Sequence, residues 1–246
     1  MNRYFYDLHI HSCLSPCADD DNTPNNIAGM GMLAGLGLMA LTDHNSCQNC
    51  PAFFKAAEKV GIIPIAGMEL ESAEEVHIVC LFPTLEDALA FGEIVASRRL
   101  PIKNKPELYG TQTIMNEEDQ VIDIDPLLLV VATTIPLDEV CGLCDSCHGV
   151  CFPAHVDRQS NGIISILGDI PPDLPFTCAE LHDMERAEEL CGKYPALSEL
   201  MLLSSSDAHR LEEINDASHF IELEASADDP DAVRAELIER LKRGRL

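Results

Sequence analysis

The chain has 246 residues, enough for one large core, and its 42 acidic and 16 basic side chains give a formal net charge of −26. This balance argues against a long nucleic acid or an anionic membrane as partner, because both attract proteins through basic patches. It does not exclude a small phosphorylated substrate, because bound divalent ions reverse the local electrostatic field at a site. The start of the chain lacks a signal segment, and the apolar run over residues 27–41 is too short to span a bilayer. We therefore expect a cytoplasmic protein.

Short apolar runs alternate with helical patterns along the chain. Strands are expected at residues 5–10, 38–42, 62–66, 76–82, 150–154, 177–181 and 200–204. A first helix should begin at Thr23 and Pro24, which form a typical helix start, and later helices are expected at 52–60, 85–97, 137–149 and 230–243. This alternation predicts an α/β fold with a mostly parallel sheet and crossover helices.

The segment from about 98 to 136 breaks this rhythm. It holds a basic, proline-rich stretch, then an acidic stretch, then the apolar run LLLVVATT. We interpret it as an insertion with its own hairpin or short helix. It is either a lid over a site or a surface elaboration, since long insertions are often functional.

Four of the eleven cysteines follow the spacing C-x2-C-x2-C-x3-C, namely Cys141, Cys144, Cys147 and Cys151. This spacing matches a run that binds iron–sulfur clusters. The alternative is a helix that buries the first three as small apolar side chains and leads into the strand that carries Cys151. We favour the structural interpretation, because the fold needs a helix between the two strands.

Imidazoles and carboxylates recur at the ends of the predicted strands. The set comprises His9, His11, His44, Glu69, His77, His155, Asp207 and His209. The pairs 9/11 and 207/209 have the two-residue period that puts side chains on one strand face. Strand ends of a parallel sheet share one rim, so these groups should converge there on two or more divalent ions such as Zn, Mn or Fe. A shared carboxylate, best assigned to Glu69, can hold two ions, generate a hydroxide and bind a phosphoryl group.

The ordered motifs DLHIHS, TDHN, GMELES, the lone His77, PAHVDR and SDAH resemble the PHP superfamily, the polymerase and histidinol phosphatase domain. The resemblance covers nearly the whole chain and treats residues 1–246 as a single PHP domain with the insertion at 98–136. It implies a distorted (β/α)7 TIM-like barrel with its metal site at the C-terminal rim of the strands. It also implies phosphoester hydrolysis by a metal-bound hydroxide with two or three metals, and no side-chain nucleophile is expected.

The resemblance also implies how the ligands divide among the metals. The first metal would take His9, His11, Glu69 and Asp207. The second would share Glu69 and take His77 and His155. A third would take His44, His209 and a ligand from the loop after the first strand. That loop reads SPCADDD and departs from the family pattern, so Cys17 or Asp19 would have to serve.

Further residues have supporting roles in this hypothesis. Asp7 and Asp43 are expected to orient the histidines from behind. Arg158 and Arg210 follow two of the expected ligands and are candidates to bind substrate phosphate, because a guanidinium matches phosphate oxygens. The alternative for both arginines is a surface ion pair.

The favoured function is thus a metal-dependent phosphoesterase acting on a small phosphorylated metabolite or nucleotide. One alternative is an exonuclease or oligonucleotide-processing enzyme of the same fold. An iron–sulfur redox protein built on the four cysteines is another, and a catalytically silent metal-binding regulator is the last.

Overall fold

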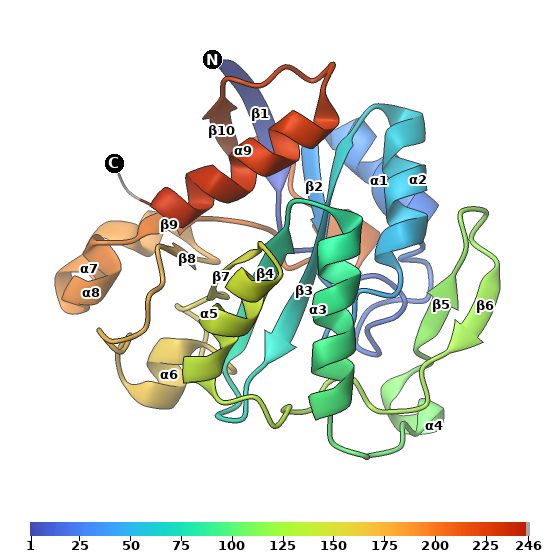
Figure 1. Ribbon diagram of the computed structural model, residues 1–246, viewed down its shortest axis with the longest axis horizontal. Coiled ribbons are helices and arrows are strands. Elements are labelled where there is room, and N and C mark those ends of the chain that lie inside the picture. Colours follow the sequence, from blue (N-terminus) through green and yellow to red (C-terminus); the bar gives the residue numbers. More distant parts are fainter. Residues whose placement is uncertain (245–246) are drawn as a thin grey trace.

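Strands and helices alternate along the chain as the sequence predicts (Figure 1). The computed structural model describes residues 1–244. The strands are β1 (Asn2–Asp7), β2 (Leu38–Leu41), β3 (Ile63–Glu71), β4 (His77–Phe82), β5 (Thr113–Met115), β6 (Val121–Ile124), β7 (Val150–Pro153), β8 (Cys178–Glu180), β9 (Met201–Leu203) and β10 (Phe220–Leu223). The α-helices are α1 (Pro24–Ala34), α2 (Cys50–Val60), α3 (Leu85–Arg98), α4 (Pro106–Tyr109), α5 (Leu137–Ser146), α6 (Ile163–Leu167), α7 (Ala187–Lys193), α8 (Pro195–Ser198) and α9 (Pro230–Arg243).

The predicted strands and helices are all present, with shifts at their ends. Thr23 caps α1 by accepting a hydrogen bond from the Asn26 N–H, and Pro24 is its first residue, as expected. Gly61 ends α2 in the left-handed conformation, with φ at 80°. Along residues 1–244, no helix combines the length and the apolar character that crossing a membrane would require.

The main sheet has the order β10-β1-β2-β3-β4-β7, and β8 pairs with β9 beside it. β1, β2 and β3 are parallel, and β8 and β9 are parallel to each other. A bridge between Ile10 and Ala208 links the segment after β9 to the segment after β1. The result is a mixed α/β fold with a curled sheet, which is compatible with a TIM-like fold.

β4 departs from the expected strand–helix alternation. It runs antiparallel to β3, with Glu71 opposite His77 in the register. The connection over residues 72–76 is a tight turn closed by the Val76 carbonyl accepting from the Ser72 N–H, so it has no room for a crossover helix. His77 therefore begins its strand, whereas the other predicted ligands lie toward the ends of theirs.

Apolar side chains form two layers on opposite faces of the curled sheet. Along β2, Leu38 and Ala40 face the inside, while Met39 and Leu41 face the outer helices. The inner layer is completed by α9, whose buried Val233, Leu237, Ile238 and Leu241 form the stripe that the sequence predicts.

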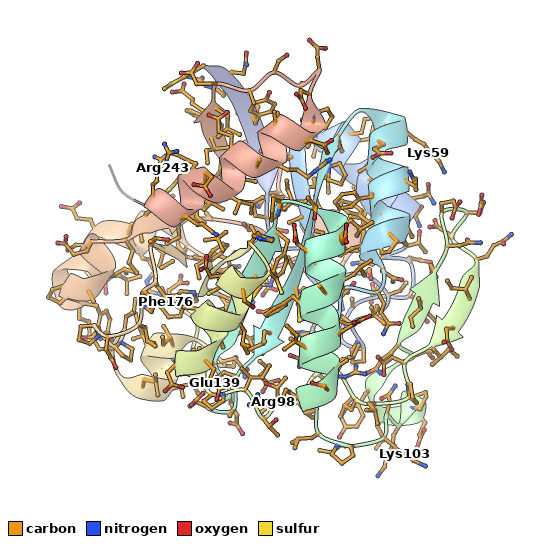
Figure 2. All side chains as sticks on the ribbon, in the orientation of Figure 1. Lys59, Arg98, Lys103, Glu139, Phe176 and Arg243 are labelled. Carbon is orange, nitrogen blue, oxygen red and sulfur yellow. The ribbon has the colours of Figure 1, made fainter. Side chains whose placement is uncertain are left out.

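The insertion at 98–136 contains both expected elements, the short helix α4 and the hairpin β5–β6. The hairpin packs beside α2, where Lys59 donates to the Glu117 carbonyl at 3.1 Å (Figure 2). It also supports the loop after β1, because the Thr113 N–H donates to the Cys13 carbonyl and Asn49 bonds to both Thr113 and Met115. In the described part of the chain, no residue of the insertion lines either cavity next to the clustered histidines, so it acts there as a support for the loop.

The four-cysteine run lies at the junction of α5 and β7. Cys141 and Cys144 are on α5, as predicted, and Cys151 is on β7. The helix ends three residues earlier than expected, at Ser146, because His148 adopts a left-handed conformation with φ at 59°. Cys147 thus lies just past the helix. Arg98 on α3 pairs with Glu139 on α5 at 3.3 Å, which joins the lower ends of these two helices (Figure 2).

Candidate metal centre

Side chains from six segments meet at the end of the curled sheet where β1 and β2 finish. They are the residues that the sequence predicts as metal ligands, namely His9, His11, His44, Glu69, His77, His155, Asp207 and His209. Most of them are nearly or fully buried. Their ligand atoms form three groups, each with members within 4.8 Å of one another, and His155 joins through Glu69.

The first group contains His9, His11, Glu69 and Asp207. The Nε2 atoms of His9 and His11 lie 3.2 Å apart, and both lie 3.1–3.3 Å from Asp207 Oδ1. Glu69 closes the group, with Oε1 at 3.3 Å from His9 Nε2 and Oε2 at 3.4 Å from His11 Nε2.

The second group shares the Glu69 carboxylate with the first. Glu69 Oε1 lies 2.8 Å from His77 Nδ1 and 3.1 Å from His155 Nε2, while Oε2 lies 3.0 Å from His44 Nδ1. Glu69 therefore stands between two sets of imidazoles, which is the geometry of a bridging ligand. The third group joins His11, His44 and His209.

Three histidines of the cluster contact hydrogen-bonding groups through their Nδ1 atoms. Glu180 Oε1 lies 3.0 Å from His9 Nδ1, and the His209 Nδ1 lies 2.8 Å from the Asp207 carbonyl. Ser15 donates to Asp43 and can therefore accept from His11 Nδ1, at 3.1 Å. When each Nδ1 carries the proton, each Nε2 is left unprotonated and free to bind a cation.

Several buried atoms of the cluster have no hydrogen-bond partner. His44 Nδ1, His77 Nδ1 and Glu69 Oε2 make no hydrogen bond, although they lie close to one another's side chains. Buried polar atoms without partners are costly, and cations between them would satisfy all three. Imidazole together with carboxylate is a donor set that suits Zn, Mn or Fe.

The charges of the cluster already favour the ligand forms of its carboxylates. Burial would raise the pKa of Glu69, but His77, His9 and His44 outweigh it and hold that pKa well below its usual value. Burial would also raise the pKa of Asp207, which His9 and His11 lower instead. Both acids are thus ionised at neutral pH.

Two ligands are held in an uncommon backbone conformation. His155 and Asp207 have positive φ angles of 29° and 52°, in the left-handed region that non-glycine residues rarely adopt. Each such residue costs about 1–3 kcal/mol, and strain of this kind concentrates at functional sites.

Asp7 and Asp43 are buried next to the cluster and hold its segments in place through hydrogen bonds. Asp7 accepts from the N–H groups of His9, Ser206 and Asn215, so it ties the end of β1 to the segment that carries Asp207. Asp43 accepts from Ser12 and Ser15, and Ser15 in turn contacts His11.

Glu180 is the main site residue that the sequence analysis missed. It lies at the end of β8, is almost fully buried, and contacts both the His9 ring and the His155 N–H, at 3.0 and 3.1 Å. Like the predicted ligands, Glu180 is a polar residue at the end of an apolar run. The same sequence pattern could therefore have predicted it.

The two predicted phosphate-binding arginines have different surroundings. Arg158 forms an ion pair with Asp207 and donates to His182 Nδ1 at 3.0 Å. Arg210 is more exposed and lies 3.6 Å from Asp19, another exposed side chain. Asp19 is therefore turned toward Arg210, which leaves Cys17 as the loop residue facing the third group.

Cys17 is an exposed residue whose thiol lies near the imidazoles of His44 and His209. Burial would raise its pKa, but these imidazoles lower the pKa of Cys17 to about 5, so the thiolate predominates at neutral pH.

Two cavities adjoin the cluster. The larger has a volume of about 1010 Å³ and is lined by residues that include Cys17, Arg158, His182, Asp207 and Arg210. The smaller, of about 130 Å³, reaches Glu69, His77 and His155. His182 also lines the larger cavity, next to Arg158.

A family model, the PHP domain, matches residues 7–199 of this chain. The chain therefore belongs to the PHP domain family.

The chain is also similar to individual proteins. It is 34% identical over 77 residues to an error-prone DNA polymerase of Symbiobacterium thermophilum, a match that covers 31% of this chain and only 7% of the polymerase. Its structure resembles the lesion-specific endonuclease EndoQ of Pyrococcus furiosus, with a TM-score of 0.53 and 21% identity, covering 85% of this chain and about half (49%) of that one. It also resembles a proposed metal-dependent phosphoesterase of Bifidobacterium adolescentis, with a TM-score of 0.54, 17% identity and coverage of 94% and 95%.

The expectation that excludes a long nucleic acid as partner is wrong. Endonuclease Q, with the same fold, has been solved with a 27-mer duplex whose lesion lies at the active site, and the polymerase match points the same way. The expectation relied on the net charge of the whole chain, whereas binding depends on the local field. Cations and arginines at a site can attract phosphate despite an acidic surface elsewhere.

Proposed function

We propose that this protein is a hydrolase that cleaves a phosphoester bond of a small phosphorylated metabolite or nucleotide, at a centre of two or three divalent ions. The observation that carries the proposal is the position of Glu69, whose carboxylate lies 2.8–3.4 Å from imidazoles of both groups. Its Oε1 is near His9, His77 and His155, and its Oε2 is near His11 and His44. A carboxylate so placed suits a pair of ions that share one ligand.

The residues divide among the ions according to the three groups. One ion would be held by His9, His11, Glu69 and Asp207, and the next by Glu69, His77 and His155 with His44 close by. His11, His44 and His209, with Cys17 beside them, would hold a third. Bound ions of this kind lower the pKa of a water molecule and polarise a phosphoryl oxygen.

The chain supplies the surroundings for that chemistry. Arg158 lines both cavities and fixes Asp207, so its guanidinium is placed to orient a phosphate at the cluster. The larger cavity is big enough for a nucleotide, since ligand pockets commonly measure about 300–1,000 Å³. We further infer that the curled sheet, closed by the bridge from Ile10 to Ala208, corresponds to the distorted seven-unit barrel that the family resemblance implies.

A phosphodiester within a nucleic acid is the second candidate substrate. It is favoured by the duplex complex of endonuclease Q and by the polymerase match. The open, larger cavity would let a strand approach the cluster from the side of Arg158 and His182.

The test begins with chelator-stripped protein reloaded separately with Mn, Zn, Fe or Mg. Each form is assayed on a panel of phosphorylated metabolites and nucleotides, a single-stranded oligonucleotide, and a duplex with an abasic site. Metal-dependent release of phosphate from a small substrate supports the first candidate, and cleavage of the oligonucleotides with higher kcat/KM supports the second. Stoichiometric metal without hydrolysis of any of these substrates would contradict both and leave the metal-binding regulator.

A further inference from the structure

Two thiols of the four-cysteine run lie in direct contact, away from the metal centre. Cys141 Sγ on α5 and Cys151 Sγ on β7 are 3.3 Å apart, and both residues are free thiols. A disulfide has a sulfur–sulfur distance of about 2.05 Å, so a movement of little more than 1 Å would bring the atoms to bonding distance. We infer that Cys141 and Cys151 form a disulfide-modification site that is oxidised by a low-molecular-weight disulfide such as oxidised glutathione.

The position of the pair makes this exchange accessible. Cys141 is partly exposed, and both cysteines line a surface cavity of about 380 Å³. Lys242 and Asp145 also line this cavity and pair with each other at 2.9 Å, so the charges at its edge are balanced. Cys144, the neighbour on the same helix, is fully buried and cannot be reached in this way.

Local structure limits the rearrangement that the bond needs. The two cysteines are ten residues apart, and the turn between them is closed by the Gly149 N–H donating to the Cys144 carbonyl at 2.9 Å. The backbone of Cys151 is also held within the sheet, because Cys151 is paired with Cys80 on β4. The disulfide would therefore link α5 to β7, two elements that are already close to each other.

The reaction balances in two steps of thiol–disulfide exchange. The Cys141 thiol loses its proton and attacks one sulfur of the glutathione disulfide, which releases one glutathione and leaves a mixed disulfide. The Cys151 thiol then loses its proton and attacks Cys141 Sγ, which releases the second glutathione. The two protein thiols are oxidised, and the small disulfide is reduced to two thiols that take up the two protons.

The environment of the two thiols affects the rate of their oxidation but not which disulfide forms. Hydrogen bonding to Cys151 and burial raise the pKa of the Cys141 thiol, so little thiolate is present at neutral pH. Oxidation should accordingly be slow at pH 7 and faster toward pH 9. Mutual contact of the sulfurs still favours the internal disulfide over a lasting mixed disulfide.

The experiment treats the full chain with excess oxidised glutathione at pH 7 and pH 9, blocks remaining thiols by alkylation, and digests without reduction. Cleavage before Asp145 separates Cys141 from Cys151, so their disulfide appears as two linked peptides. We expect this linkage in the wild type, in Cys144→Ala and in Cys147→Ala, its loss in Cys141→Ala and Cys151→Ala, and its reversal by dithiothreitol. The wild type should also gain several degrees of Tm on oxidation, and Cys141→Ser should not.

Circular dichroism checks that each variant is folded. Where Cys151→Ala fails this check, Cys141→Ala and Cys141→Ser at the partly exposed position decide the question alone. Absence of the linkage in folded wild type at pH 9, or its persistence in a folded Cys141 variant, would overturn the inference.

Discussion

His77 Nδ1, at the start of β4, lies 2.8 Å from Glu69 Oε1, near the end of β3. The two residues meet because β4 runs antiparallel to β3, so the beginning of one strand and the end of the other share a rim. A parallel β4 would place His77 at the opposite end of the sheet. One reversed strand thus brings a ligand to Glu69 from only eight positions further along the chain.

Replacing Glu69 by Gln should affect two metal positions at once. The amide keeps the shape but removes the negative charge that His9, His77 and His44 surround. We expect metal content to fall by at least one ion per chain and kcat/KM to fall by about 100-fold or more, since weaker supporting contacts already give 10–100-fold effects. Metal analysis and turnover are the measurements, with Glu93→Gln on the exposed face of α3 as control. Full metal content with wild-type turnover would exclude a bridging role.

Replacing Glu180 by Ala should weaken the first metal position without removing a ligand. Its carboxylate holds the Nδ1–H of His9 and accepts from the His155 N–H. Loss of this contact frees the His9 ring to rotate or change tautomer, so we expect metal affinity to drop by about 10–100-fold. Glu180→Gln retains an acceptor oxygen and should recover much of the loss. Equal affinity of Glu180→Ala and wild type would show that His9 needs no such support.

Cys17 should give the third metal position a thiolate ligand. Cobalt(II) bound to sulfur has an intense near-ultraviolet charge-transfer band, whereas cobalt bound only to nitrogen and oxygen lacks it. We expect this band in the cobalt-loaded protein, its loss in Cys17→Ser, and its persistence in Asp19→Asn, because Asp19 faces Arg210. Cobalt that binds stoichiometrically without the band would rule out the thiolate ligand while leaving the other positions intact.

Arg158 and Arg210 should differ in their effects on catalysis. Arg158 contacts Asp207 and lines both cavities, whereas Arg210 pairs with Asp19 at an exposed position. We expect Arg158→Ala to lower kcat/KM by about 10–100-fold, and Arg210→Ala by about threefold or less, as is usual for exposed pairs. Steady-state kinetics with the best substrate decides this. Arg158→Lys should rescue only partly, because an ammonium lacks the two-pronged contact.

Metal affinity should fall as the pH is lowered. Burial would lower the pKa of His9, but Glu180, Glu69 and Asp207 raise it well above its usual value, and Cys17 and Glu69 do the same for His44. Both rings therefore hold a proton more strongly in the metal-free protein than a free imidazole does, and a bound ion must displace such protons. Calorimetric titration with zinc at pH 6 and pH 8 should give tighter binding at pH 8, by about tenfold per pH unit for each proton displaced. Affinity independent of pH, or no proton release, would contradict this.

Much of the cluster could be predicted, because its residues follow one rule. A histidine or acid next to a short apolar run marks a strand end, and strand ends share a rim. Two residues of the site were not predicted, for different reasons. Glu180 satisfies the rule but belongs to a short strand without a histidine, and Ser15 acts only through Asp43 and His11.

The direction of β4 could not be read from its own residues, since an apolar run looks alike in either direction. The sequence does carry one indirect signal, which is the lack of a helical pattern between β3 and β4. The exclusion of nucleic acid failed for another physical reason, because net charge averages over a surface while a substrate meets only one part of it.

The bridge between Ile10 and Ala208 has a consequence for folding. It is flanked by His9 and His11 on one side and by Asp207 and His209 on the other, so the two ends of the ligand set come from opposite ends of the chain. Joining them closes a loop of nearly 200 residues, so these segments should meet late in folding, and an ion bound there would hold them together. Without the ion, we expect the contact between these two segments to open first. The short turn between β3 and β4 still keeps Glu69 and His77 together.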